Sequence, residues 1–234
     1  MRRCSIVLFL FCAVTGAVAQ TMPAPPQLTW VRYYAAGDPA DFNRAPFEKL
    51  LAEKKIAGFG VLAPATHIGD PWTRVVFVGV ANWAALDAVA SAFAADRVTL
   101  PNGVHDVVLR HVAQSAAPPA AKPKYVVVNT HPITRGRDSD ALALFNEWAK
   151  PVFLDLESKG KVGPWGLSAQ NVVVDNEWTY MVWYFLADLS ALDDVGKALA
   201  GVGASRLETY ERRLREMSED DYRGQLLRVV YMAP

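Results

Sequence analysis

The sequence predicts an α+β protein made of two tandem βαββαβ units, packed sheet to sheet as an intramolecular barrel. The main observation is a repeat: residues 60–94 align without a gap to residues 166–200, and 12 of the 35 positions are identical. Trp72 and Trp178 match each other within the repeat. A fixed-offset match that keeps rare residues in register is typical of a duplicated structural unit. The predicted strands and helices also recur in the same order.

In the first unit, turn residues separate the predicted strands and helices. Valine-rich or aromatic segments predict strands at 30–36, 59–65, 74–81 and 105–113. Between the first two strands, an apolar stripe that stops at Gly58 predicts a helix from about residue 41. Asn82 is a good cap for a second helix.

The second unit repeats this order, with one addition. Strands are expected at 125–131, 165–172, 178–187 and 225–232. The first helix should run from about Ser139 to Gly160 with a kink at Pro151, and the second should start at Ser190. The charged segment 205–222 predicts an extra helix with a solvated face, which the first unit lacks.

The first 19 residues have the pattern of a secretory signal. Arg2 and Arg3 precede an apolar run, and the small residues Ala17 and Ala19 fit a cleavage site before Gln20. We therefore expect a secreted, most simply periplasmic, protein. Both cysteines lie within this segment, so the mature chain would have no disulfide and no thiolate metal site.

The remaining chain divides into a lead at 20–28, a first unit at 29–113, a proline- and alanine-rich linker at 114–124 and a second unit at 125–234. Removal of Arg2 and Arg3 from the 24 basic residues leaves 22 against 24 acidic residues. This balance gives no electrostatic reason to expect nucleic acid or a membrane as partner. A barrel that closes within one chain predicts a monomer.

The third strand of each unit is apolar on both faces. Val76 and Val78 alternate with Val75 and Phe77, and the equivalent strand at 178–187 is just as apolar. An antiparallel strand with one wet face alternates apolar with polar residues, so both faces are expected to be covered. The simplest arrangement packs the two sheets against each other.

By strand order, duplication and burial pattern, residues 29–234 resemble the dimeric α+β-barrel superfamily. Its ferredoxin-like units pair sheet to sheet, and some members carry both units in one polypeptide. The resemblance identifies no specific member family. It implies a choice among cofactor-free monooxygenases, isomerases, haem enzymes and members without known activity, because this fold does not settle function.

Polar and aromatic side chains on the strands predict a site between the two sheets. If Val126 and Val128 face the helices, the alternate residues of both first strands face the opposing sheet. Burying a polar group there costs free energy unless it is hydrogen-bonded to another protein group or to water. Polar side chains at these positions therefore favour a cavity. The predicted ligand-binding residues are Arg32, Tyr34, Trp72, Arg74, Asn129, His131, Trp178 and Tyr180. The alternative, in which these side chains only fill the barrel, stays open.

The sequence contains four histidines. His67 lies in a predicted turn and His105 begins a strand, so both are expected at the surface. His111 shares a strand face with apolar residues and is expected to be a hydrogen-bonded core or rim residue. His131 ends a central strand beside Asn129, where a neutral imidazole could act as a base, and it is the candidate catalytic residue. No second ligand stands at a metal-binding spacing from it.

Three functions follow from these observations. The leading hypothesis is a barrel that binds a small, largely apolar ligand between its sheets, without catalysis. The second is a cofactor-independent monooxygenase or isomerase with His131 as base. The third is a haem-binding protein, or a structural or partner-binding module with a filled barrel. No cofactor is predicted. A site in the barrel would be asymmetric at equivalent positions where the two units carry different residues. The expected equivalent pairs of this kind are Ala36/His131, Tyr34/Asn129 and Arg74/Tyr180.

Overall fold

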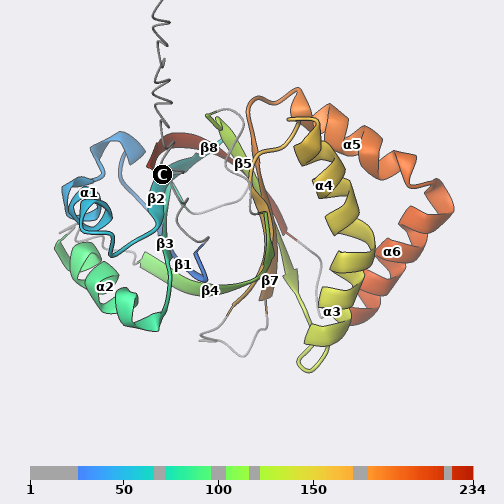
Figure 1. The fold of residues 1–234 in the computed structure, drawn as a ribbon, viewed down its shortest axis with the longest axis horizontal. Coiled ribbons are helices and arrows are strands. Elements are labelled where there is room, and N and C mark those ends of the chain that lie inside the picture. Colours follow the sequence, from blue (N-terminus) through green and yellow to red (C-terminus); the bar gives the residue numbers. More distant parts are fainter. Residues whose placement is uncertain are drawn as a thin grey trace, which may run out of the picture.

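The computed structural model describes residues 26–65, 72–95, 104–115, 122–170, 179–218 and 223–233. The strands form a closed barrel in the order β1-β3-β2-β8-β5-β7-β6-β4, and every neighbouring pair is antiparallel. Figure 1 shows the barrel in the middle, with the helices of the first unit on one side and those of the second unit on the other. The predicted α+β class and intramolecular barrel are confirmed.

The first unit follows the expected βαββαβ order. Asn82 Oδ1 accepts a hydrogen bond from the Ala85 amide, so this residue caps its helix as predicted. The elements are β1 (Leu28–Tyr34), η1 (Pro39–Asp41), α1 (Ala45–Ala52), β2 (Gly58–Pro64), β3 (Arg74–Val80), η2 (Trp83–Ala85), α2 (Leu86–Ala95) and β4 (Val104–Gln114).

The second unit repeats this order and adds the predicted charged helix as α6. Its elements are β5 (Tyr125–Pro132), α3 (Asp138–Leu144), η3 (Phe145–Ala149), α4 (Lys150–Ser158), β6 (Trp165–Gln170), β7 (Thr179–Leu186), α5 (Ala191–Gly201), α6 (Ala204–Met217) and β8 (Arg223–Ala233). The irregularity expected at Pro151 is the π turn η3, just before it. Proline has no amide proton for the helical bond, and a wider turn accommodates that loss.

Some predictions lie outside the described residues. These are the signal peptide at 1–19, most of the lead at 20–28, most of the linker at 114–124, His67 and Trp178. The linker's first residue, Gln114, belongs to β4. Within the described ranges, no helix has the length and apolar character needed to cross a membrane.

Two seams join the units into the barrel. β2 pairs with β8, and β4 pairs with β6. The register shifts once in each seam, between Val61 and Leu62 and between His111 and Ala113. Such a bulge increases the local twist and bends the sheet, which favours closure.

The barrel wall has apolar side chains on both faces, as predicted. The interior cluster contains Val31, Val75, Val126 and Met181. Two further clusters lie between the wall and the helices, one in each unit. The sheet is therefore buried on both faces, which explains the missing apolar–polar alternation.

Each unit places an aromatic ring across a glycine of the neighbouring strand. Gly60 is paired with Phe77 and Gly166 with Trp183, and both pairs are equivalent in the 106-residue repeat. A Cβ atom on Gly60 would lie 2.4 Å from Phe77, and one on Gly166 would lie 2.5 Å from Trp183. Only a residue without a side chain lets these rings lie flat across the strand.

We expect Gly166→Ala to destabilise the protein by about 1–3 kcal/mol, because the new methyl group must displace the Trp183 ring. Urea unfolding followed by far-UV circular dichroism measures this change. Gly196→Ala in α5 is the matched control, since its Cβ would meet no atom within 4 Å. The control should be neutral or stabilising by up to about 1 kcal/mol. Equal effects of both substitutions would contradict the role of the glycine.

Candidate functional site

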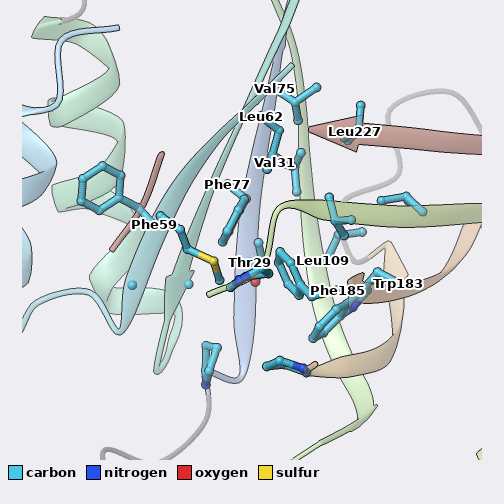
Figure 2. A pocket seen from close by; sticks show the side chains of 18 of the residues that line it. Thr29, Val31, Phe59, Leu62, Val75, Phe77, Leu109, Trp183, Phe185 and Leu227 are labelled. Atoms are coloured by element: carbon cyan, nitrogen blue, oxygen red, sulfur yellow. The ribbon is translucent and has the colours of Figure 1, made fainter. Parts of the chain in front are cut away.

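A cavity of about 550 Å³ lies inside the barrel. Figure 2 shows Val31, Phe77, Leu109 and Phe185 around it, with side chains contributed by both units. Of the described lining residues, only Lys122 carries a formal charge, and it lies at the end of the barrel where β5 begins. The cavity therefore offers a largely apolar surface with few polar positions.

One polar network crosses the wall of this cavity. His111 Nε2 lies 2.8 Å from Thr29 Oγ1, and its Nδ1 lies 2.7 Å from Ser168 Oγ. Trp183 Nε1 donates to the same serine oxygen at 2.9 Å. The four residues come from β1, β4, β6 and β7, so the network connects the units across the β4–β6 seam.

The network contains more donors than contacts. The indole N–H, the two hydroxyls and one imidazole N–H give four donor hydrogens for three contacts. If Nε2 carries the imidazole proton, the spare hydrogen is on Thr29; if Nδ1 carries it, the spare hydrogen is on Ser168. Thr29 lines the cavity, whereas Ser168 is fully buried. The first tautomer therefore presents a hydroxyl donor to a molecule inside the barrel.

Burial keeps His111 uncharged. It lowers the pKa of His111 from 6.5 to about 4, since the desolvated imidazole loses its hydration when it becomes charged. Both ring nitrogens have partners, which confirms the expectation of a hydrogen-bonded core histidine. In the described part of the chain, no group of three histidine, cysteine or acidic side chains could hold a metal ion.

Most of the predicted interior residues that the structure describes lie on the other face of the wall. Val126 and Val128, expected to face the helices, line the barrel cavity instead. Asn129 and His131 face the helices of the second unit. The run of three valines at 126–128 fits either register, and a shift by one residue exchanges the two faces of a strand. The assignment of these residues to the space between the sheets was therefore wrong.

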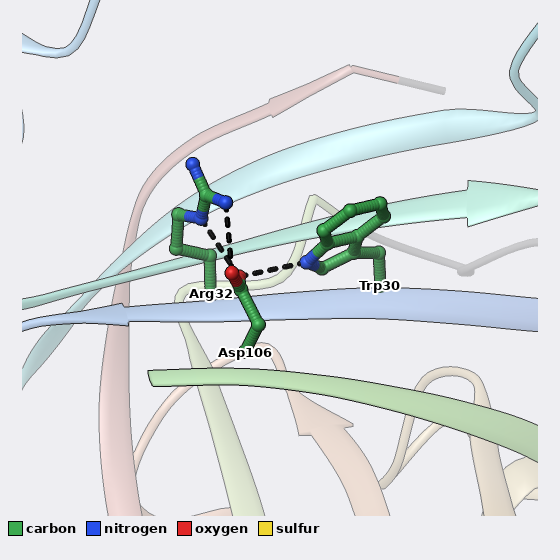
Figure 3. A network of polar contacts seen from close by, with 3 residues as sticks. All are labelled: Trp30, Arg32 and Asp106. Carbon is green, nitrogen blue, oxygen red and sulfur yellow. Dashed lines mark hydrogen bonds and ion pairs between the residues drawn. The ribbon is translucent and has the colours of Figure 1, made fainter. Parts of the chain in front are cut away.

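Arg32 shows what the helix-facing side chains of the first unit do. It forms a two-pronged ion pair with Asp106, with Nε–Oδ1 and Nη2–Oδ2 distances of 2.7 and 2.8 Å. Trp30 Nε1 donates to the same carboxylate at 2.8 Å (Figure 3). The Arg32 guanidinium also lies 4.2 Å from the centre of the Phe93 ring, in α2. Burial opposes the charge of Arg32, but the hydrogen bond and charge of Asp106, together with Tyr34, outweigh this effect and raise the pKa of Arg32.

Arg74 and Tyr34 also belong to the helix side of the first unit. The Arg74 guanidinium lies 4.0 Å from the centre of the Tyr34 ring and is 2% exposed. Tyr34 in turn packs with Phe42 in a buried cluster with the helices. Arg74 Nη1 also donates to the backbone oxygen of Asp38 at 3.4 Å, so this hydrogen bond, the cation–π contact and packing hold the two side chains on the helix side.

In the second unit, the Tyr180 hydroxyl donates to Asp138 at the start of α3. Burial and this hydrogen bond raise the pKa of Tyr180. Trp72 is the one described member of the predicted set on the interior side. Its ring lies 5.6 Å from that of Tyr33 and 6.0 Å from that of His105, at one end of the barrel. His105 is exposed, as predicted.

His131 lines a second cavity of about 260 Å³, between the sheet and the helices of the second unit. Burial lowers the pKa of His131 from 6.5 to about 4, so this imidazole is also neutral at pH 7. The structure brings His131 and Asn129 together in this cavity, but it separates both from Arg32, Tyr34 and Arg74.

Sequence reasoning missed Thr29, Ser168 and Trp183. A serine inside the otherwise apolar β6 and a tryptophan opposite a glycine were the available signals. Neither signal gives a role without the barrel order, because Thr29, His111 and Ser168 are far apart in the sequence and meet only through the β1–β4 and β4–β6 pairings.

We expect the free energy of unfolding to decrease as the pH is lowered from about 6.5 to about 4. Unfolded histidines take up protons at about pH 6.5, whereas folded His111 and His131 resist protonation down to about pH 4. The unfolded state thus binds more protons than the folded state in this window. Each histidine therefore lowers the free energy of unfolding by about 1.4 kcal/mol for each pH unit of acidification. Urea unfolding of wild type and His111→Gln across this range should give a smaller pH slope for the variant. Equal slopes would contradict the buried, neutral His111.

Comparison with known proteins supports the architecture. No protein-family model matches the sequence, and no curated protein matches it. A candidate monooxygenase from Fusobacterium nucleatum is similar with 11% identity and a TM-score of 0.58, over 90% of this chain and 95% of that one. An anthrone oxidase-like protein has 11% identity and a TM-score of 0.57, over 88% and 92% of the two chains.

A dye-decolorizing peroxidase from Bacteroides thetaiotaomicron has 9% identity and a TM-score of 0.57, over 89% of this chain and 94% of that one. At such low identity these likenesses show the fold alone. The chain therefore has the fold of the ferredoxin-like, dimeric α+β-barrel proteins, with both units in one polypeptide.

Proposed function

We propose that this protein is a secreted, monomeric barrel that binds a small, largely apolar molecule in its interior cavity. The observation that carries the proposal is a cavity of about 550 Å³ with largely apolar walls and a hydrogen-bonded cluster at Thr29 and His111. Ligand sites in proteins are typically about 300–1,000 Å³, mostly apolar, with a few polar groups that fix the orientation.

Secretion is supported by the signal pattern at 1–19. The monomeric state is supported by the closed strand order, which leaves no strand of the barrel unpaired along its edge. In this arrangement the second unit takes the place that a partner subunit would occupy.

The chemistry of His111 favours binding over base catalysis. A general base works best when its pKa is near the operating pH. A histidine with a pKa of about 4 holds a proton weakly, so it is a poor base for an alcohol or an activated C–H group at pH 7. It is a good neutral hydrogen-bonding group, and in the tautomer with the proton on Nε2 it leaves the Thr29 hydroxyl hydrogen for a ligand acceptor.

A second candidate is a cofactor-independent oxygenase or isomerase. It is supported by the printed names of the similar structures, an anthrone oxidase-like protein and a candidate monooxygenase. In this case the base would be His111 in place of the expected His131, because His111 is the described histidine that lines the barrel cavity. Its hydrogen bond to Thr29 would then place both groups against the substrate.

The described histidines beside the two cavities do not fit haem. Both nitrogens of His111 are engaged, by Thr29 and Ser168. His131 lines a cavity of about 260 Å³. That volume is below the range of about 300–1,000 Å³ typical of sites for drug-sized molecules, and a porphyrin is larger than most of these. We therefore derive no haem chemistry from these residues.

We expect Thr29→Val to weaken binding of an apolar ligand with one carbonyl group by about fivefold to tenfold, because one hydrogen bond is lost. Binding of a hydrocarbon of the same size should be unchanged. Anthrone and 9,10-dihydroanthracene form such a pair, and tryptophan fluorescence or calorimetry can follow both. Thr209→Val on α6 is the matched control and should have no effect, since Thr209 Oγ1 bonds only within its own exposed helix turn. Failure of the wild type to bind either compound would refute the proposal.

We expect anthrone to be bound without turnover in aerated buffer, because His111 is a weak base. Absorbance spectra over several hours detect oxidation to the quinone. Enzyme-dependent oxidation that His111→Gln abolishes, while the fold and the affinity for dihydroanthracene are retained, would establish the second candidate instead.

A further inference from the structure

The second unit contains a crevice between its sheet and its helices that the barrel function does not use. Its floor consists of Asn129 and His131 from β5 and Val182 and Tyr184 from β7. The walls come from η3, α4, α5 and α6, and the partly exposed apolar side chains of α5 and α6 lie at its outer side. These wall residues are Trp148, Ala149, Val152, Phe153, Val195, Leu199, Val202, Leu207, Tyr210, Glu211 and Leu214.

Three polar groups in this crevice have hydrogen-bonding capacity to spare. Within the described ranges, the Asn129 amide and the hydroxyls of Tyr184 and Tyr210 form no hydrogen bond. Tyr184 is nevertheless only 6% exposed. Buried polar groups are usually paired, with protein, water or a ligand. Trp148 Nε1, in the wall of the same crevice, is buried and has no hydrogen-bond partner among the described residues. A molecule with matching polar groups in this space would satisfy this donor together with the three partly or fully buried groups.

The strand register shows that large side chains of the first unit occupy the positions equivalent to the crevice floor. Tyr34 pairs with Arg74, and His131 pairs with Tyr180, its repeat equivalent. Tyr34 is thus the counterpart of His131, and Arg32 that of Asn129; the expected pairs Ala36/His131 and Tyr34/Asn129 were two residues out of step. In the first unit these positions carry large side chains with close partners.

The second unit has smaller polar residues at both positions, and it alone has α6, which supplies one wall of the crevice. The open space is therefore a local difference between two copies of one scaffold. A packing defect common to the fold would occur in both copies.

The charges of the wall restrict the class of occupant. Of the described lining residues, Glu211 at the outer side is the one charged group. His131 is neutral because burial lowers its pKa to about 4, and burial raises the pKa of Tyr184 to about 12, so its hydroxyl stays protonated. The Arg206 guanidinium lies beside this wall, 5.0 Å from the centre of the Trp148 ring, but Arg206 does not line the crevice. Among the lining groups, an anion would meet the negative charge of Glu211 and no positive charge.

Shape and polarity complete the description. A volume of about 260 Å³ exceeds the cavity of about 150 Å³ that holds benzene, so two fused rings can be accommodated. Trp148, Phe153, Tyr184 and Tyr210 offer aromatic surface for a planar molecule. The Asn129 amide presents a donor and an acceptor side by side, which matches the edge of a lactam or a primary amide.

We propose that this crevice, lined by Asn129, Tyr184 and Tyr210, is a second binding site, for a neutral, planar, fused-ring molecule with an amide-type edge. It is separate from the barrel cavity and lies on the opposite face of the β5–β7 wall. The proposal does not depend on what the barrel interior binds.

Calorimetric titration of the full chain with 2-quinolinone, a neutral bicyclic lactam, tests the site. We expect binding at least about tenfold tighter than that of quinoline-2-carboxylate, which has similar size and a negative charge. Asn129→Leu should weaken 2-quinolinone binding about tenfold, since it removes both hydrogen bonds of the amide. Leu207→Trp, at a partly exposed wall position, should abolish binding by filling the crevice.

Matched controls separate this site from the barrel. Thr29→Val should leave 2-quinolinone binding unchanged, and Tyr210→Phe, a mild substitution of a partly exposed residue, should weaken it about threefold to tenfold even if a larger replacement fails to fold. Circular dichroism confirms the fold of each variant. No binding by the wild type, equal binding of the carboxylate, or wild-type affinity in Asn129→Leu and Leu207→Trp would overturn the proposal.

Discussion

The pairing of strands across the two seams is the constraint on which the rest of the structure depends. β2–β8 and β4–β6 turn two open four-stranded sheets into one closed wall, and each seam bends at a bulge. Closure gives the interior its volume and removes exposed edges that would pair with other chains. It also brings Thr29, His111 and Ser168 together, because the β4–β6 seam runs through their network and the shift lies next to His111.

The interior is specific because its walls are largely apolar. A buried imidazole that gives up its charge and hydrogen-bonds to two hydroxyls contributes direction without a net charge. The glycine positions opposite Phe77 and Trp183 have a related effect, because they let large rings lie along the wall and leave space along the axis. A methyl group at either glycine would push a ring inward.

The repeat at offset 106 and the apolar third strands were sufficient to predict the units and the barrel, and the charged segment 205–222 predicted the additional helix α6. The face of each strand was not predictable. Val126, Val127 and Val128 satisfy both registers, and the large polar side chains Arg32 and Arg74 proved to be held by Asp106 and by aromatic rings on the helix side. Such contacts join segments more than 35 residues apart, so they cannot be predicted from the spacing of residues within one strand or helix. His111 was correctly placed in the core, but its partners could not be inferred.

Fusion of the two units into one polypeptide has a consequence for how such a barrel can change. In a barrel built from two identical chains, every substitution occurs twice, so a cavity opened for a ligand is also opened in the partner and its cost in stability is doubled. Here the copies vary independently. The first unit retains Tyr34, Phe47 and Phe93 as a dense layer under its helices, while the second carries smaller polar residues and a crevice. One half can thus specialise while the other keeps the barrel folded.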